Sequence, residues 1–235
     1  MLFALRHLAN PLPLANDHLT ASTALPSLCQ KVQTLRLRPS ADHPLMGRFV
    51  VFDTETTGFN YKRGDEIISL GAVAVDNGEV TKEYFTEFVN PYRPIPETTT
   101  KLTGITNSMV APAPDILTVL DQFLDFKGTT PLVAHNASFD LNFINHKLRK
   151  YCGYRLTTAT VDTFVLSSLL RPLEETHTLD DLALAYEVPL KGRHTALGDS
   201  IITAHIFTKM VQQLFAKGIK TTYQLANYLQ LRRLI

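Results

Sequence analysis

Acidic residues at three places in the chain have the types and spacing that divalent cations require. Asp53 and Glu55 stand two residues apart, where the apolar run 49–52 ends. Side chains two apart on an extended chain point to the same side, so these two carboxylates can converge. Carboxylate oxygens are the ligands that Mg²⁺ and Mn²⁺ prefer. This stretch alone supports equally well a plainer alternative, in which Asp53 opens a turn and Glu55 is solvated.

The second place is Asp140, in the first turn of a helix expected over 138–151. Ser138 is expected to cap that helix, and the helix dipole alone favours an acid there by a few tenths of a kcal/mol, roughly. The helix follows a strand expected over 132–135. If that strand lies parallel to and beside the strand that ends at Asp53, Asp140 faces the same crevice as Asp53.

The third place is Asp199, which lies between Gly198 and Ser200 in a helix expected over 195–215. The small neighbours leave room for close approach, although a single Asp on a solvated helix face is the plainer interpretation. His194 precedes Asp199 by five residues, which is about 140° around a helix, so the two do not share one face. His194 is therefore expected on a mobile loop before the helix, where an imidazole suits general-base work near neutral pH.

Three other histidines compete with His194 for a chemical role. His135 is interpreted as packing at a strand end. His177 and His205 have no acidic residue at a spacing that would indicate a shared site. His194 thus remains the candidate base.

Four acids and one histidine predict the hydrolysis of a phosphodiester. Two divalent cations about 3.5–4 Å apart can clamp a phosphodiester, one lowering the pKa of an attacking water and the other stabilising the leaving 3′ oxygen. Asp53 is expected to bridge the two cations, and His194 to take the proton from the water. The remaining ligands are expected to be Glu55, Asp140 and Asp199. Ligands that are all oxygens favour Mg²⁺ or Mn²⁺ over zinc.

The elements that must position these residues follow from hydrophobic periodicity and turn residues. Strands are expected over 49–53, 66–75 and 79–89, and short turns between them imply an antiparallel meander. Strands over 132–135 and 160–162 then alternate with helices. The fold class is therefore α/β, with a mixed five-stranded sheet flanked by helices. Helices or helical turns are expected over 25–37, 98–102, 114–126, 138–151, 163–170, 179–186, 195–215 and 222–231.

Composition excludes some classes of protein. The 235 residues are 45% hydrophobic and 19% charged, with a formal net charge of +1, so a nucleic acid would have to be held by a local basic patch. No apolar run approaches the roughly 18 residues that span a bilayer, and no membrane partner is expected. Cys29 and Cys152 show neither a metal-type spacing nor a disulfide framework. They are interpreted as free thiols in a reducing compartment, and a cytoplasmic location is expected.

Three segments resemble the exonuclease motifs of the DEDD superfamily, histidine subtype. They are Asp-Thr-Glu-Thr-Thr-Gly at 53–58, His-Asn-Ala-Ser-Phe-Asp at 135–140 and His-Thr-Ala-Leu-Gly-Asp at 194–199. Residues 47–209 are similar to the proofreading epsilon subunit of bacterial DNA polymerase III and to the exonuclease module of the Gram-positive replicative polymerase. The resemblance implies a ribonuclease H-like fold. It also implies a two-metal 3′–5′ exonuclease of DNA replication that releases nucleoside 5′-monophosphates from the 3′ end of single-stranded DNA.

The resemblance also implies an organisation and a set of substrate contacts. An exonuclease domain is expected over 47–210, preceded by an extension of unknown role over 1–46 that packs on it or binds a partner. A helical tail over 211–235 is expected to pack on the domain, and its shortness makes a partnership with a polymerase doubtful. Leu102 and Thr103 are expected against the terminal nucleotide. The full substrate-binding set is Thr54, Thr57, Gly58, Leu102, Thr103, Asn136 and Phe139.

Other features leave alternatives open. The basic residues near the motifs could contact phosphates, although charge clusters are more often solvated; they are Lys62, Arg63, Lys147, Arg149, Lys150, Arg155, Lys191 and Arg193. The threonines and glycine of the first motif resemble those of the DNA-directed members of the superfamily, a resemblance that favours DNA over RNA. A 3′–5′ exoribonuclease that trims RNA, a catalytically silent nucleic-acid-binding module and a structural domain with incidental acids remain as alternatives.

Overall fold

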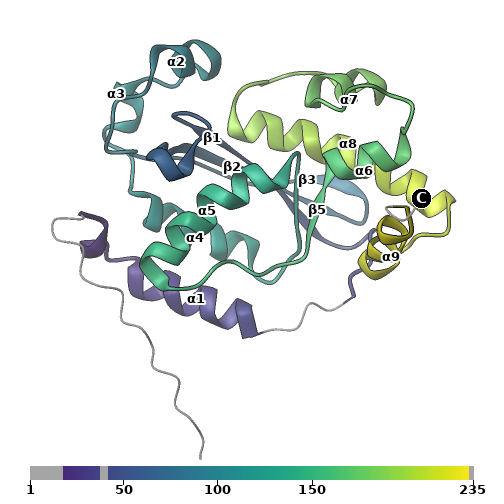
Figure 1. The fold of residues 1–235 in the computed structure, drawn as a ribbon, viewed down its shortest axis with the longest axis horizontal. Coiled ribbons are helices and arrows are strands. Elements are labelled where there is room, and N and C mark those ends of the chain that lie inside the picture. Colours follow the sequence, from purple (N-terminus) through teal and green to yellow (C-terminus); the bar gives the residue numbers. More distant parts are fainter. Residues whose placement is uncertain (1–17, 38–41, 233–235) are drawn as a thin grey trace, which may run out of the picture.

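The computed structural model describes residues 18–37 and 42–232, and Figure 1 shows their arrangement. Its helices and strands lie close to the expected ranges. The strands are β1 (Phe49–Thr56), β2 (Ile67–Asp76), β3 (Glu79–Phe88), β4 (Leu132–Ala134) and β5 (Thr160–Asp162). The helices are α1 (Leu25–Leu37), α2 (Glu97–Thr103), α3 (Asn107–Val110), α4 (Ile116–Lys127), α5 (Ala137–Cys152), α6 (Thr163–Leu170), α7 (Leu179–Ala185), α8 (Ala196–Ala216) and α9 (Thr222–Arg232).

The five strands form one mixed sheet in the order β3-β2-β1-β4-β5. The pairs β1–β2 and β2–β3 are antiparallel, whereas β4 is parallel to both β1 and β5. This confirms the predicted meander followed by parallel strands. β1 continues past its expected end at Asp53, because Glu55 still pairs with Ser69 of β2. Both acids of the first motif therefore lie on regular extended backbone.

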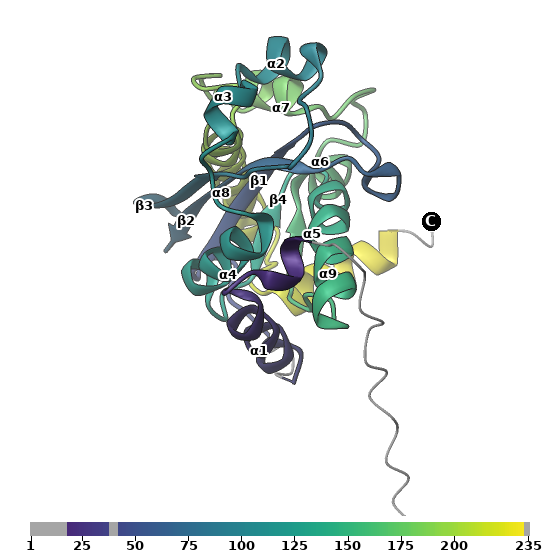
Figure 2. The same cartoon turned by 90° about the vertical axis from the view of Figure 1, so that its left-hand side faces the viewer.

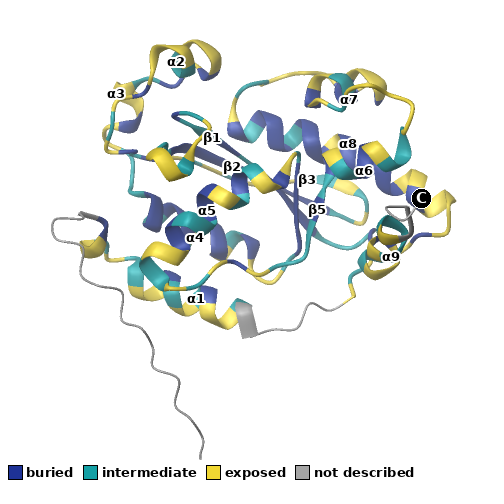
Figure 3. Cartoon of the chain, in the orientation of Figure 1, coloured by how far each residue is buried: buried dark blue, intermediate teal, exposed yellow. Residues whose placement is uncertain are grey.

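Helices cover both faces of the sheet (Figures 1 and 2). On one face, Val50 and Phe52 of β1 pack in a core with α1, α4 and α5. On the other face, Phe49 and Val51 pack with α6, α7, α8 and α9. The alternation follows from the two-residue period of a strand, and Figure 3 shows how fully both cores are buried. α2, α3 and α7 lie toward the same end of the molecule, at the top of both views, with α7 apart from α2 and α3 in Figure 1.

Helix α1 is joined covalently to the helix that carries the second motif. Its Leu28 and Val32 are fully buried against α4 and α5, and Lys31 lies 2.8 Å from a carboxylate oxygen of Asp121. Cys29 forms a disulfide with Cys152, the last residue of α5. The prediction of two free thiols was therefore wrong. The cysteines are 123 residues apart in sequence, and only the packing of α1 on α5 brings their Cα atoms to 5.0 Å.

In the parts of the chain that the structure describes, helices are too short or too polar to cross a membrane.

Candidate active site

Three of the four predicted acids converge at the carboxyl end of β1. Asp53 and Glu55 point to the same side of β1, and Asp199 reaches them from the first turn of α8. Each offers a carboxylate oxygen, and these atoms all lie within 4.8 Å of one another. Such a group of oxygens has the size and chemistry to hold a divalent cation.

A glycine lets α8 approach closely enough to deliver Asp199. Gly71 of β2 is paired with Asp53, and a Cβ atom on it would lie 2.2 Å from the backbone nitrogen of Leu197. Ser200, one residue after Asp199, donates a hydrogen bond of 3.0 Å to the Gly71 carbonyl. The start of α8 is thus fixed against the backbone of β2 beside Asp53.

The fourth acid, Asp140, is buried next to this group and is held by the first motif. Thr54 donates two hydrogen bonds to one Asp140 oxygen, from its backbone nitrogen at 2.9 Å and from its hydroxyl at 2.6 Å. Asp140 lies in the first turn of α5, as predicted. The two bonds tie the helix to β1 and orient the carboxylate between the two motifs.

Crowding of acids away from water raises their proton affinity. Burial, helped by the charges of Asp140, Glu55 and Asp199, raises the pKa of Asp53 well above its usual range. Burial first, and then the charge of Asp199, raises the pKa of Glu55 to about 7. Burial likewise raises the pKa of Asp140 to about 7, although its hydrogen bonds with Thr54 act in the opposite direction. Ionised together, these groups need positive charge between them.

His194 lies on the loop just before α8, as predicted. Its φ of 64° is in the left-handed region, which is uncommon for a residue other than glycine. Its backbone nitrogen donates to Asp199 at 3.3 Å, and its ring Nδ1 lies 3.2 Å from Nη1 of Arg193. The imidazole is therefore placed beside the acids by the same loop that leads to Asp199.

Comparison with known protein families finds a match over the segment that contains the three motifs. The family model described as "Exonuclease" matches residues 50–207, which span β1 to α8 and all three motifs. The chain belongs to this exonuclease family. This confirms the resemblance that the three motifs indicated.

Relatives place the exonuclease family segment inside larger proteins. The chain is 44% identical over 176 residues to a "DNA polymerase III subunit epsilon-like protein" of Rhodobacter capsulatus, covering 74% of this chain and 25% of that protein. It is 44% identical over 188 residues to a "DNA polymerase III PolC-type" of Caldanaerobacter subterraneus, covering 80% of this chain and 13% of that one. The chain thus spans a quarter or less of these two curated relatives.

Solved structures share the exonuclease fold. The structure of Exonuclease X in complex with 5′ overhanging duplex DNA superposes with a TM-score of 0.60 and 26% identity, covering 77% of this chain and 99% of that one. The nuclease domain of 3′hExo, described as a DEDDh family member bound to rAMP, gives a TM-score of 0.62 at 20% identity, covering 71% and 92% of the two chains. These likenesses confirm the predicted ribonuclease H-like fold.

Besides Thr54, which holds Asp140, further residues of the predicted substrate-binding set have structural contacts. Thr57 is buried, and its hydroxyl accepts a hydrogen bond from the backbone nitrogen of Glu66. Thr103 is also buried, and its hydroxyl donates to the Thr99 carbonyl. A side chain at Gly58 would collide with the Asp65 carboxylate, so glycine at this bend leaves room for Asp65. These residues shape the end of β1 and the α2 turn.

Other members of the set are open to solvent. Leu102 is 53% exposed on α2, and Asn136 is exposed at the start of α5. Phe139 is half-buried and lies between Phe143, which is buried, and Phe59, which is 86% exposed. Phe59 and Leu102 thus offer apolar surface to a ligand.

Two of the candidate basic residues are already engaged in ion pairs. Lys147 of α5 is buried and lies 2.6 Å from a carboxylate oxygen of Glu66. Arg193 is paired with Asp199 and with Asp180 of α7. Neither has a free charge for phosphates in this structure.

Asp162 is a positioning residue that sequence analysis missed. Its carboxylate accepts hydrogen bonds from the backbone nitrogens of Asn136 (2.9 Å), Ala137 (3.0 Å) and Phe164 (2.9 Å). It therefore caps α5 and α6 together. The predicted cap by Ser138 was wrong, because α5 begins one residue earlier and Ser138 instead donates to the Asn136 side chain. An Asp directly before a helix is a known capping signal, but nothing in the sequence ties Asp162 to α5.

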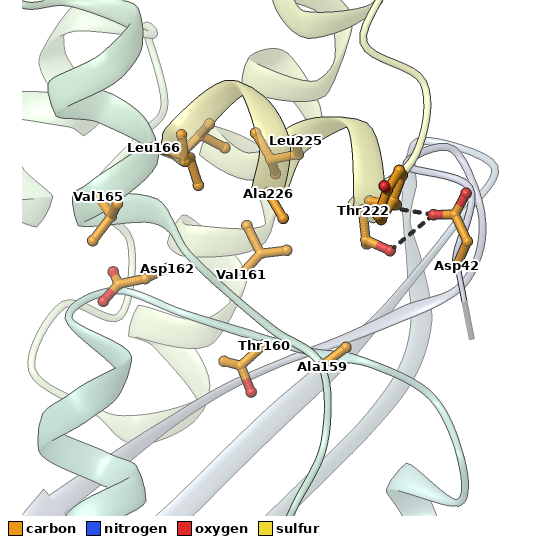
Figure 4. A pocket seen from close by; sticks show the side chains of 12 residues that line it. Asp42, Ala159, Thr160, Val161, Asp162, Val165, Leu166, Thr222, Leu225 and Ala226 are labelled. Carbon is orange, nitrogen blue, oxygen red and sulfur yellow. Dashed lines mark hydrogen bonds between the residues drawn. The ribbon is translucent and has the colours of Figure 1, made fainter. Parts of the chain in front are cut away.

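Asp162 also lines a cavity of about 490 Å³ that is bordered by β5, α6 and α9 (Figure 4). Most of its other lining residues are apolar, among them Val165 and Leu166 of α6 and Leu225 of α9. Asp42 closes one end of it through hydrogen bonds with Thr222 and Tyr223. None of the four predicted acids lines this cavity. Asp162 contributes to the cavity wall and also holds the start of α5, the helix that carries Asp140.

We expect Gly71→Ala to lower both stability and nuclease activity. The added methyl group would collide with the backbone of Leu197, and backbone cannot rotate away as a side chain can. Overpacking of this kind typically costs about 1–3 kcal/mol, and moving α8 would also displace Asp199. Thermal unfolding and a nuclease assay measure the two effects. Ala74→Gly, in the same strand, is the control for altered strand propensity; unchanged stability in Gly71→Ala would contradict the close approach.

Proposed function

We propose that the domain is a divalent-cation-dependent 3′–5′ exonuclease that hydrolyses single-stranded DNA from its 3′ end and releases nucleoside 5′-monophosphates. The observation that carries the proposal is the convergence of Asp53, Glu55 and Asp199 within 4.8 Å, with His194 on the adjoining loop. Family membership supports the reaction class. The names of the relatives support DNA as the polymer and a DNA polymerase as the partner.

The residues present fit divalent cations. The candidate ligands are carboxylates whose pKa values are raised by burial and mutual repulsion, and such a group is stabilised by a cation. We propose that Asp53, Glu55, Asp140 and Asp199 hold two ions of Mg²⁺ or Mn²⁺. When bound, the ions supply charge for the attacking water and for the leaving 3′ oxygen. Thr54 keeps Asp140 facing the first motif, and Gly71 and Ser200 keep Asp199 in place.

The protein's own residues also suggest how a strand end would be held. Phe59 is exposed on the loop after β1, and Leu102 is exposed on α2, which the Thr99 hydroxyl ties to the carbonyl of Thr57. Aromatic and apolar side chains support single-stranded bases by stacking. We propose that these two side chains contact the terminal nucleotides, and that His194 accepts the proton of the attacking water.

We expect His194→Ala to slow hydrolysis while leaving cation binding intact. A positioned general base typically accelerates a reaction about 10²–10⁴-fold. For His194→Ala we expect the rate of hydrolysis to fall about 10²-fold, at the lower end of this range. Single-turnover rates on a short oligonucleotide measure the loss, and a Mn²⁺ titration confirms that cations still bind. His205→Ala, within α8 and outside the site, is the control. Wild-type rates across neutral pH would remove His194 from the reaction.

Cation binding should weaken as the pH falls below about 7. The pKa values of Glu55 and Asp140 are raised from 4.5 and 3.8 to about 7, so below that pH a cation must displace protons from them. Because these pKa values exceed those in the unfolded chain, the metal-free folded protein binds more protons than the unfolded chain between about pH 4 and 7. Its free energy of unfolding therefore decreases as the pH rises through this range.

The measurement is the increase in melting temperature that Mn²⁺ causes relative to EDTA. We expect this increase to grow from about pH 5 to pH 8 as the carboxylates ionise. An increase that stays constant over this range would contradict raised carboxylate pKa values.

A time course on 5′-labelled single-stranded DNA and on RNA of the same sequence, with Mg²⁺, Mn²⁺ or EDTA, tests the proposed function. A ladder that shortens from the 3′ end on DNA and disappears in EDTA is the expected result. A ladder confined to RNA would retain the mechanism but reject the substrate. No ladder on either polymer would reject the proposed activity.

A further inference from the structure

Arg193 joins the group of acids to a neighbouring helix. Its Nε and Nη2 atoms each lie 3.0 Å from a different carboxylate oxygen of Asp180, in α7. Its Nη1 atom lies 2.5 Å from a carboxylate oxygen of Asp199. One guanidinium therefore spans two acids, Asp199 with a 7% exposed side chain inside the site and Asp180 with a 50% exposed side chain outside it.

The backbone that carries Arg193 is fixed. The Thr195 hydroxyl donates to the Gly192 carbonyl at 2.7 Å, and that carbonyl packs so closely on Gly198 that a Cβ atom there would lie 1.9 Å from it. The loop is thus anchored to the first turn of α8. Movement of the guanidinium relative to Asp199 must come from rotation of the side chain.

Arg193 contacts the carboxylate of Asp199, a residue that the proposed function assigns to cation binding. Asp199 has two carboxylate oxygens; one accepts from the His194 backbone and the other from Arg193. Asp199 is also one of the three acids whose oxygens converge. The positive guanidinium that contacts Asp199 repels any second positive charge beside that carboxylate. Arg193 and a divalent cation therefore compete for Asp199.

We propose that Arg193 is an internal counter-cation that competes with divalent metal for Asp199, and that Asp180 is the acceptor that holds the guanidinium aside when metal binds. The inference rests on the proposed metal-binding role of Asp53, Glu55 and Asp199. Without metal, Arg193 offsets the repulsion among these acids. With metal, the two bonds to Asp180 keep the guanidinium satisfied after its contact with Asp199 is lost.

The test is a titration of the full chain with Mn²⁺ in the absence of nucleic acid, with free Mn²⁺ measured by electron paramagnetic resonance. Removing a competing charge should tighten binding, so we expect Arg193→Gln to bind Mn²⁺ about tenfold more tightly than the wild type. Asp180→Asn leaves Arg193 with Asp199 as its remaining charged acceptor, so it should bind Mn²⁺ several-fold more weakly. The double variant should bind like Arg193→Gln, because Asp180 acts through Arg193.

Arg48→Gln is the matched control for loss of one positive charge. Arg48 lies just before β1, at the end remote from the acids, and pairs with Glu83. Its replacement should leave Mn²⁺ affinity unchanged. Equal affinity in the wild type, Arg193→Gln and Asp180→Asn would overturn the inference, as would weaker binding in Arg193→Gln. Should Arg193→Gln not fold, unchanged or tighter binding in Asp180→Asn overturns it alone. Failure of the wild type to bind Mn²⁺ would instead reject the proposed function together with the inference.

Discussion

Replacing Asp53 by alanine is expected to abolish nuclease activity without lowering the stability of the metal-free protein. Asp53 lies in β1, the middle strand of the sheet, and the charges of Asp140, Glu55 and Asp199 all act on it. Loss of the charge stabilisation that depends on its oxygens, about 5 kcal/mol or more, corresponds to at least about 10⁴-fold in rate. This is the largest effect on activity that we expect from one substitution.

Most substitutions at half-buried positions lower stability, whereas Asp53→Ala is expected to preserve or raise the stability of the metal-free protein. Burial and the charges of Asp140, Glu55 and Asp199 raise the pKa of Asp53, so its ionised form is unfavourable in the folded protein near neutral pH. Alanine removes that repulsion. In EDTA we therefore expect a melting temperature equal to or above that of the wild type, and we expect the increase caused by Mn²⁺ to be much reduced.

Single-turnover hydrolysis and thermal unfolding, each with Mn²⁺ and with EDTA, measure both effects. Asp76→Ala is the matched control, since Asp76 is an exposed acid at the far end of β2. It should leave activity and the Mn²⁺ response unchanged. Activity of Asp53→Ala near that of the wild type would show that Asp53 lies outside the reaction.

Breaking the disulfide between Cys29 and Cys152 is expected to have the largest effect on stability. The bond joins residues 123 apart, and in the chain-entropy model closing a loop of about that length stabilises the folded state by roughly 4–5 kcal/mol. For a chain of this size, that corresponds to a fall of roughly 10 °C or more in melting temperature. The loss should appear as detachment of α1, which buries Leu28 and Val32 on α4 and α5.

Thermal unfolding of Cys29→Ser, Cys152→Ser and the wild type, with and without dithiothreitol, measures this contribution. Both variants should melt alike, and dithiothreitol should lower only the wild type to their level. Free thiols in the oxidised wild type, detected by labelling of the unfolded chain, would contradict the disulfide.

Sequence patterns predicted the features that depend on neighbouring residues. Apolar runs, alternation and turn residues predicted five strands, and the side-chain period of a strand predicted that Asp53 and Glu55 face one way. The place of His194 before α8 followed from helix geometry alone. A parallel pairing of the strands over 49–53 and 132–135, stated as a condition, was what brought Asp140 to Asp53, and for Asp199 the only signal was the small size of its neighbours Gly198 and Ser200.

Features that depend on contacts between distant segments were not predictable in this way. The disulfide joins two segments whose packing is decided by buried residues of α1, α4 and α5. The second role of Asp162, in capping α5, depends on β5 lying beside β4. Gly71 did carry a signal, since a glycine inside a strand often marks close approach by another backbone, but the sequence does not say that α8 is the segment that approaches.

The position of α8 has a consequence for how the protein is made. One face of the central strand, with Phe49 and Val51, is covered mainly by helices that follow residue 162, and α8 is the longest of them. A ribosome releases the strands well before it completes α8, so this apolar face stays open during synthesis. A nascent chain that stops before α8 exposes the sheet to other chains and to chaperones, and it also lacks Asp199. The main cover of this face and the group of acids therefore both depend on synthesis of the same helix.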